Sequence, residues 1–166
     1  MKKKRILLIA LMTVLAVTAY AQQYDPESDF QIDWDDNVEG GVIITKYIGS
    51  KKEVIIPPKI QNNPVTSIGY YVFKDNRNIT KVTIPNGVTN IGWSAFENCT
   101  SLTSVPIPNS VSAFQGCTSL TSVNFQGTIN LDFSVFYKLG DLWEKYLAGG
   151  IGTYTRTSGS NTWTKQ

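Results

Sequence analysis

A short apolar pattern recurs through the middle of this 166-residue chain. Four strand-like segments carry the pattern, and they start at Val54, Val82, Val105 and Val123. A phenylalanine follows each of the first three, at Phe73, Phe96 and Phe114. A repeat of 20 to 30 residues is typical of solenoids, in which each coil stacks on the one before it. The sequence therefore predicts a β-rich solenoid over residues 53–129, a parallel β stack of about 3.5 coils.

The second repeat shows the expected orientation of the side chains. Val82 and Ile84 are apolar and fall on one side of a strand, while Lys81 and Thr83 fall on the other side. We interpret the first pair as facing the core and the second as facing out. Gly92 follows Ile91 and is expected to permit a tight bend.

The spacing of the phenylalanines predicts the register. Phe73 and Phe96 are 23 residues apart, whereas Phe96 and Phe114 are 18 apart. We expect the three rings to form one interior column and the strands after residues 53, 81 and 104 to run parallel. The first coil carries extra residues at 58–66.

The shorter third coil lacks an equivalent of the apolar Ile91. That loss removes about 1.5 to 3 kcal/mol of burial. The third coil is therefore predicted to be the least stable, with faster amide exchange at 108–114 than at 86–96.

The first 21 residues are typical of a secretory signal peptide. Basic residues at 2–5 precede an apolar stretch at 6–18, and Ala19-Tyr20-Ala21 forms an A-x-A cleavage site. The alternative is an uncleaved membrane anchor, but the apolar stretch is short for a bilayer. We expect an exported protein (periplasmic, cell-surface or secreted) with no membrane span in the mature chain.

Composition excludes several classes of function. Cleavage after Ala21 leaves 11 basic and 13 acidic residues, so a nucleic-acid partner is not expected. The chain contains no histidine, which excludes Ser-His, Cys-His and His-metal sites, and we expect no cofactor. Cys99 and Cys117 fall at equivalent positions of adjacent repeats, where either a disulfide or two buried thiols would fit.

Residues 22–52 are expected to form an N-terminal β cap. Phe30, Ile32 and Trp34 alternate with polar residues as in a half-buried strand, and 42–47 is a second β-rich run. We interpret the two as a hairpin over the open end of the first coil. The loop between them resembles a calcium loop in its first acidic positions, but the required glycine and final glutamate are missing, which favours a plain turn.

Residues 130–166 break the period and predict a C-terminal helix and hairpin cap. Apolar residues at helical spacing predict a helix at about 141–148. Asp141 and Glu144 resemble a capping box, and Gly149-Gly150 is a stop signal. Segments 152–156 and 162–164 flank a Ser-Gly-Ser-Asn turn, which indicates a hairpin.

Together the repeats follow the pattern I-P-x-x-V-x-x-I-G-x-x-A-F-x-x-C-x-x-L. Its residues here are Ile84-Pro85, Ile91-Gly92, Ala95-Phe96, Cys99 and Leu102. Over about residues 54–129 the chain resembles the BspA-like leucine-rich repeat family, surface or secreted proteins of host-associated anaerobes and spirochaetes, including treponemes. The resemblance implies adhesion or host-protein binding, and it transfers no ligand or site residue.

Two surfaces are candidates for partner binding. The outward strand rows contain Lys81, Thr83, Ser104, Ser122 and Asn124, and their alternative is an ordinary solvated sheet. Tyr70, Tyr71 and Trp93 follow the bend glycines. These aromatics would hold a sugar ring or a protein hot spot, or else pack against the entry hairpin.

The leading hypothesis is a non-catalytic binding module for an extracellular protein or glycan. The first alternative is a structural surface paralogue without a specific ligand. The second is a carboxylate-based hydrolase that uses the acidic loop of Asp35, Asp36 and Glu39. The sequence leaves the oligomeric state open.

Overall fold

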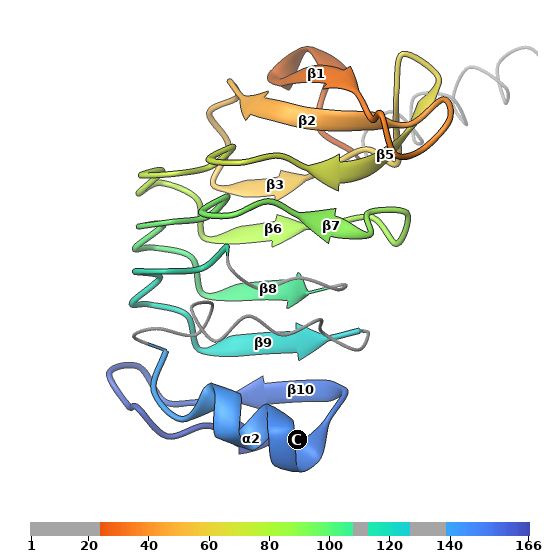
Figure 1. The fold of residues 1–166 in the computed structure, drawn as a ribbon. Coiled ribbons are helices and arrows are strands. Elements are labelled where there is room, and N and C mark those ends of the chain that lie inside the picture. Colours follow the sequence, from red (N-terminus) through yellow and green to blue (C-terminus); the bar gives the residue numbers. More distant parts are fainter. Residues whose placement is uncertain (1–23, 108–112, 127–138) are drawn as a thin grey trace, which may run out of the picture.

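The computed structural model describes residues 24–107, 113–126 and 139–166. Its strands form two ladders that run along opposite sides of one elongated core (Figure 1). Within the described ranges, no helix combines the length and apolar character that a membrane crossing requires. The predicted signal peptide lies outside the described residues, as do positions 108–112 of the shortened third coil.

The first ladder contains the repeated strands in the predicted parallel order. Strands β3 (Glu53–Ile55), β6 (Lys81–Thr83), β8 (Ser104–Ile107) and β9 (Ser122–Phe125) pair side by side. In each strand the valine at the second position is buried. Strands β10 (Gly152–Thr155) and β11 (Thr164–Lys165) then extend the sheet in the antiparallel sense. The structure confirms a β-rich repeat fold, and this mixed pairing leaves the number of about 3.5 closed coils a prediction.

The second ladder begins with the entry hairpin. Strands β1 (Phe30–Trp34) and β2 (Val42–Tyr47) are antiparallel, as the sequence predicts. Strand β2 then pairs in parallel with β5 (Asn63–Ile68), which pairs with β7 (Asn90–Ile91). The extra residues of the first coil form β4 (Lys59–Ile60), which turns back on β5. A short 3-10 helix, η1 (Glu27–Asp29), precedes β1.

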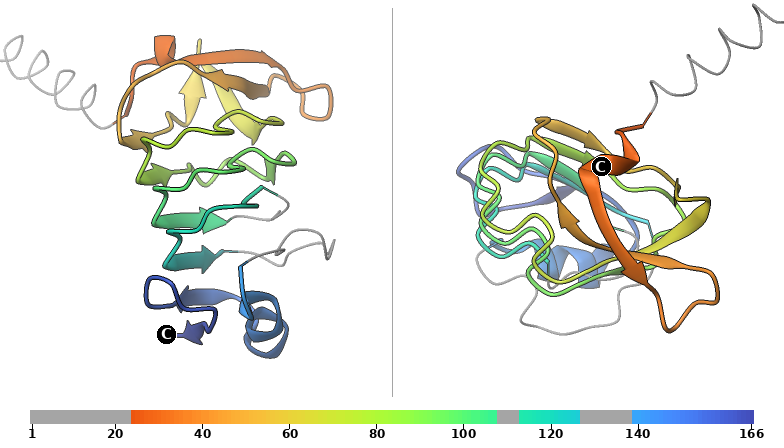
Figure 2. Two further views of the ribbon diagram at one scale, coloured as in Figure 1. Left: turned by 90° about the vertical axis from the view of Figure 1, so that its left-hand side faces the viewer. Right: turned by 90° about the horizontal axis from the view of Figure 1, so that it is seen from above.

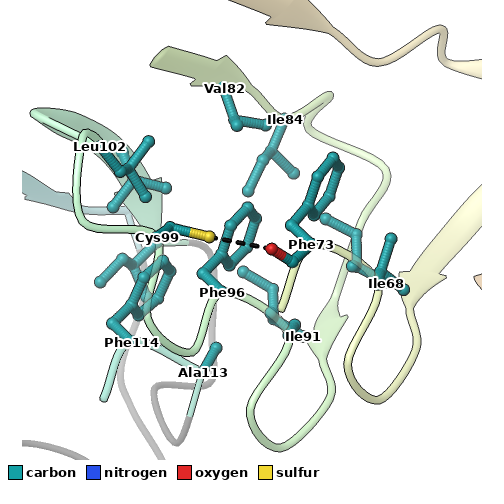
Figure 3. Packing of buried hydrophobic residues seen from close by; sticks show 14 of the residues in the cluster. Ile68, Phe73, Val82, Ile84, Ile91, Phe96, Cys99, Leu102, Ala113 and Phe114 are labelled. Carbon is teal, nitrogen blue, oxygen red and sulfur yellow. Dashed lines mark hydrogen bonds between the residues drawn. The ribbon is translucent and has the colours of Figure 1, made fainter. Parts of the chain in front are cut away.

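The interior contains the predicted column of phenylalanines (Figure 3). The ring centroids of Phe73 and Phe96 are 4.8 Å apart, and those of Phe96 and Phe114 are 4.9 Å apart. The planes of neighbouring rings are nearly parallel, with interplanar angles of 5° and 7°. Phe30 and Tyr47 extend the aromatic contacts into the entry hairpin. The register on which the repeat interpretation depends is therefore confirmed.

Both cysteines are buried and free, so the two-thiol alternative holds. The Cys99 thiol donates a hydrogen bond to the Phe73 carbonyl oxygen, and the Cys117 thiol donates to that of Phe96. Each thiol thus bonds to the preceding coil at 3.0 to 3.1 Å. Burial raises the pKa of both thiols, which keeps them protonated and suits this donor role.

Gly92 has a different role from the one predicted. Its backbone is not in the left-handed region, so the bend itself does not require glycine. A Cβ at Gly92 would lie 2.6 Å from the backbone carbonyl carbon of Gly69. Glycine is needed here because the backbones of adjacent coils approach too closely for any side chain.

Left-handed residues occur at equivalent turn positions of three coils. They are Asp75, Asn98 and Gly116, with φ of 60°, 58° and 76°. Asp, Asn and Gly are the residues that adopt this conformation most readily. The Asn98 side-chain amide also donates to the Asp75 carboxylate at 2.9 Å, so the turns are linked from coil to coil.

Different segments of the chain cover the two ends of the first ladder (Figure 2). At β3, the backbone N–H of Asp25 donates to the Ile55 carbonyl oxygen, and the Asp25 carboxylate accepts from the Ile55 N–H. Asp25 therefore occupies backbone groups that an exposed edge would offer to another chain. At the other end, helix α2 (Leu142–Gly149) covers the last strands with Leu142 and Tyr146.

Helix α2 agrees with the predicted helix to within one residue at each end, and the C-cap residue Gly150 that follows it has a positive φ of 68°. The predicted capping box is wrong. The N-cap residue Asp141 makes no side-chain bond to the start of the helix. Its carboxylate instead accepts the backbone N–H of Trp163 at 2.7 Å. A tertiary contact with the terminal hairpin thus replaces the local cap.

Candidate functional site

The outward strand rows have the register that the sequence predicts. Lys81 pairs with Ser104, and Ser104 pairs with Ser122. Lys81 and Thr83 are exposed, whereas Ser104, Ser122 and Asn124 are half-buried. The result is a small, polar sheet face. A groove of about 570 Å³ reaches this face at Thr83, beside Tyr24 and the ends of β3 and β6.

The aromatic candidates lie on the other ladder, where β5 and β7 end. Tyr70 follows β5 by two residues, and Trp93 occupies the equivalent position after β7. The exposed fractions are 69% for Tyr70, 47% for Tyr71 and 48% for Trp93. The entry hairpin therefore does not bury these side chains, and the alternative in which they pack against it is wrong.

Contacts among the aromatics hold part of this surface in place. The rings of Tyr71 and Trp93 meet edge to face, with centroids 5.5 Å apart. The Lys74 ammonium lies 5.0 Å from the centre of the Tyr71 ring. Tyr71 itself has a positive φ of 62°. A non-glycine residue in this conformation costs about 1 kcal/mol or more, so neighbouring contacts must maintain it.

A groove of about 490 Å³ links Tyr70 to the entry hairpin. Trp34 and Asp36 border it on the hairpin side, and Tyr70 borders it on the repeat side. Ile43 and Thr45 of β2 also line it, as do Asn90 and Gly92. The groove therefore joins the non-repeated entry segment to the first two coils.

Trp34 is a functional candidate that the sequence analysis missed. The alternating pattern assigned it to the buried side of its strand, with Phe30 and Ile32. Phe30 is buried, but Trp34 is 63% exposed. Ile32 still packs against the core, so the alternation of faces holds up to that residue, and Trp34 is exposed as the last residue of β1. The only sequence signal was its position beside the acidic loop.

The acidic loop holds one buried carboxylate, that of Asp35. One of its oxygens accepts hydrogen bonds from the hydroxyls of Thr66 at 2.6 Å and Ser67 at 3.0 Å. The other oxygen accepts the backbone and side-chain N–H groups of Asn37. The Thr66 hydrogen bond is the largest cause that lowers the pKa of Asp35, and burial opposes it. Asp35 is therefore ionised at neutral pH, and it anchors the loop to β5.

Comparison with known proteins decides the family. A family model described as BspA type Leucine rich repeat region matches residues 47–153 in 6 copies.

The chain belongs to the BspA-type leucine-rich repeat family.

Three solved leucine-rich repeat structures are similar to this BspA-type chain. A leucine-rich repeat protein of T. pallidum is 21% identical, with 60% of this chain and 70% of that chain covered and a TM-score of 0.39. A leucine-rich cell surface protein of Faecalibacterium prausnitzii is 23% identical, with coverages of 67% and 43% and a TM-score of 0.46. A leucine-rich repeat protein of Bacteroides ovatus is 28% identical, with coverages of 64% and 29% and a TM-score of 0.49. This chain thus spans less than half of the last two proteins.

No curated protein matches the chain. Within the BspA-type repeats, the family motif accounts for buried residues such as Ile91, Phe96 and Leu102. The exposed candidates, Tyr70, Tyr71 and Trp93, stand at positions that the core does not determine. Trp34 lies before the matched segment. Any binding specificity of this chain must therefore come from side chains outside the repeat motif.

Proposed function

We propose that this BspA-type repeat protein is an exported, non-catalytic module that binds an extracellular protein or glycan. Its predicted site of action is the cell surface or the surrounding medium, and the binding contributes to adhesion. The main supporting observation is that the exposed rings of Trp34 and Tyr70 line one groove. Two further exposed aromatics, Tyr71 and Trp93, directly follow the lining residues Tyr70 and Gly92 in the chain. Exposed aromatics in such a group supply large contact areas at low cost in conformational entropy.

The side chains around the groove support recognition rather than catalysis. Both carboxylate oxygens of Asp35 are engaged by hydroxyl and amide donors. A general acid or base requires a carboxyl that can reach a substrate. Asp36 and Glu39 are exposed, so the hydrolase alternative would rest on these two of its three residues.

The test is binding of the purified, exported protein to a panel of extracellular matrix proteins and to a glycan array. We expect saturable binding that falls at least tenfold when Tyr70→Ala is combined with Trp93→Ala, because interface aromatics contribute about 1 kcal/mol or more each. The matched control is Leu147→Ala with Ile151→Ala. These two exposed apolar residues lie in the tail, far from the groove in sequence.

Two outcomes would contradict the proposal. Absence of saturable binding to the whole panel would favour the structural paralogue without a ligand. Loss of binding with Lys81→Ala plus Thr83→Ala, but not with the aromatic pair, would move the interface to the outward strand face. That face would then include Ser104, Ser122 and Asn124.

A further inference from the structure

The groove between Trp34 and Tyr70 has an unbalanced negative charge. Among the described residues that line it, three are aspartates (Asp33, Asp35 and Asp36) and none is basic. The ion pairs of the described chain involve other acids, namely Asp25, Glu97 and Asp141. Hydroxyl and amide groups stabilise the Asp35 carboxylate without neutralising it. The groove therefore presents a negative potential to solvent.

The aromatic borders of the groove suit the same kind of ligand. The faces of tryptophan and tyrosine attract ammonium and guanidinium groups within about 6 Å of the ring centre. This chain uses such contacts itself, with Lys74 at 5.0 Å from the Tyr71 ring centre and Arg156 at 4.7 Å from that of Trp163. In the groove, Trp34 and Tyr70 are exposed and stand beside carboxylates. Aromatic rings and carboxylates together favour a cation over a neutral group.

We propose that the groove between Trp34 and Tyr70 binds a lysine- or arginine-rich segment of a protein partner, with a cationic side chain beside the Asp36 carboxylate. This inference rests on the proposed binding function and specifies the chemistry of the partner. A neutral sugar would stack on the rings but would gain nothing from the charge. A sialylated or sulfated glycan would be repelled by the aspartates.

The probe is a fluorescent lysine-rich peptide, measured by anisotropy with the exported protein at two salt concentrations. The comparison peptide has glutamine in place of each lysine. We expect saturable binding of the lysine peptide only, and weaker binding at higher salt because the exposed charges are screened. Asp33→Asn combined with Asp36→Asn should lower the affinity about five- to thirtyfold, because both exposed carboxylates would lose their attraction to the cationic peptide.

The matched control removes two exposed charges elsewhere, through Glu53→Gln and Glu144→Gln. This variant has the same net charge as the aspartate pair and should bind as the native protein does. Trp34→Ala provides a second test, and it should lower the affinity for the lysine peptide about tenfold. Thermal unfolding of each variant shows whether the fold is retained.

Three results would overturn the inference. They are equal binding of the glutamine peptide, equal losses with the two charge-matched variants, and binding of a glycan in place of the lysine peptide. The proposed function fails separately. A matrix protein whose binding depends on Tyr70 and Trp93 but is insensitive to the aspartates would leave that function standing and reject the cationic partner.

Discussion

The repeated core and the entry segment are built on different principles. In the core, equivalent residues of successive coils touch one another, as Phe73, Phe96 and Phe114 do. In the entry segment, single polar residues hold the chain, as Asp25 and Asp35 do. The core is stabilised by nearest-neighbour packing of apolar groups. The entry segment packs Phe30, Ile44 and Tyr47 against that core and adds these directional bonds, and it contributes the exposed Trp34 and the acidic loop.

This difference has a consequence for function. Residues of the repeated core are determined by what lies directly above and below them, which leaves little room for variation. The entry segment repeats nothing, so its exposed side chains are free of that constraint. The groove forms where the two parts meet, at Trp34 and Tyr70. Substitutions in the two regions should therefore differ in size, in mechanism and in dependence on pH.

The largest expected effect is that of Phe96→Ala in the middle of the column. Phe96 is fully buried between two stacked rings. The free energy of unfolding should fall by about 3 to 5 kcal/mol, from lost burial and from the cavity. Urea denaturation followed by circular dichroism measures this change. Tyr70→Ala is the exposed control and should change stability by less than about 0.5 kcal/mol, whereas equal losses would refute the stacking argument.

Gly92→Ala tests the close approach of adjacent coils. The added methyl group would lie 2.6 Å from the Gly69 carbonyl carbon, which is backbone and cannot rotate away. We expect a loss of about 2 to 3 kcal/mol in the free energy of unfolding. Gly87→Ala is the matched control, since its nearest atom would be 3.4 Å away and its φ is not positive. If Gly92→Ala left the free energy of unfolding unchanged, the backbones of adjacent coils could move apart without cost.

Asp35→Asn tests the polar anchor of the entry loop. Hydrogen bonds to a charged group contribute about 1.5 to 3 kcal/mol, so a loss of about 2 kcal/mol is expected at neutral pH. Asp36→Asn, an exposed neighbour, should change stability by less than about 0.5 kcal/mol. Urea midpoints of the variants and the native protein measure both effects.

The same pair of variants tests the pH dependence. The folded-state pKa of Asp35 lies below its ordinary value of 3.8. Its contribution is therefore complete above that ordinary value, and it is lost as the pH falls through the lower, folded-state value. The stability gap between the native protein and Asp35→Asn should narrow in strong acid. A gap that widens in acid would mean that Asp35 is protonated in the folded protein.

The smallest expected effect is that of Asp25→Asn at the edge of the first ladder. Asparagine retains an acceptor for the Ile55 N–H, so mainly the ion pair with Lys51 at 2.6 Å is lost. Because Lys51 is more than half exposed, solvent screens the ion pair, and the expected loss is smaller than that of Asp35→Asn. Lys51→Met should produce the same loss, and the double variant should add nothing. If the effects of the two single substitutions added up in the double variant, Asp25 and Lys51 would contribute to stability independently.

The repeat interpretation succeeded where equivalent positions reinforce one another. Strands β3, β6, β8 and β9, the phenylalanine column and helix α2 were all predicted from periodicity. Apart from the role of Gly92, the errors concern residues that appear once. Trp34 was assigned to the core by alternation, and Asp141 to a local cap. Trp34 is exposed as the last residue of β1, and a contact with Trp163, distant in sequence, replaces the local cap of Asp141.

The candidate site was predicted in part. Tyr70, Tyr71 and Trp93 were candidates from their position after the bend glycines, and of the two alternatives left open the structure shows the exposed one. The groove was not predicted, because its borders are about 36 residues apart along the chain, at Trp34 and Tyr70. The buried hydrogen bonds of Asp35 to Thr66 and Ser67 were also missed. Nothing in the spacing of these residues indicates that β2 lies beside β5.

By itself, the sequence determined the family, the interior column and the parallel order of the repeated strands. Only one register of the coils buries all the periodic apolar residues, so their pattern is sufficient to predict these three features. The tertiary structure decided that Trp34 faces solvent, that Asp35 is buried and charged, and that a groove lies between the hairpin and the first coils. Those features depend on how a non-repeating segment meets the stack, and side-chain periodicity carries no information about that contact.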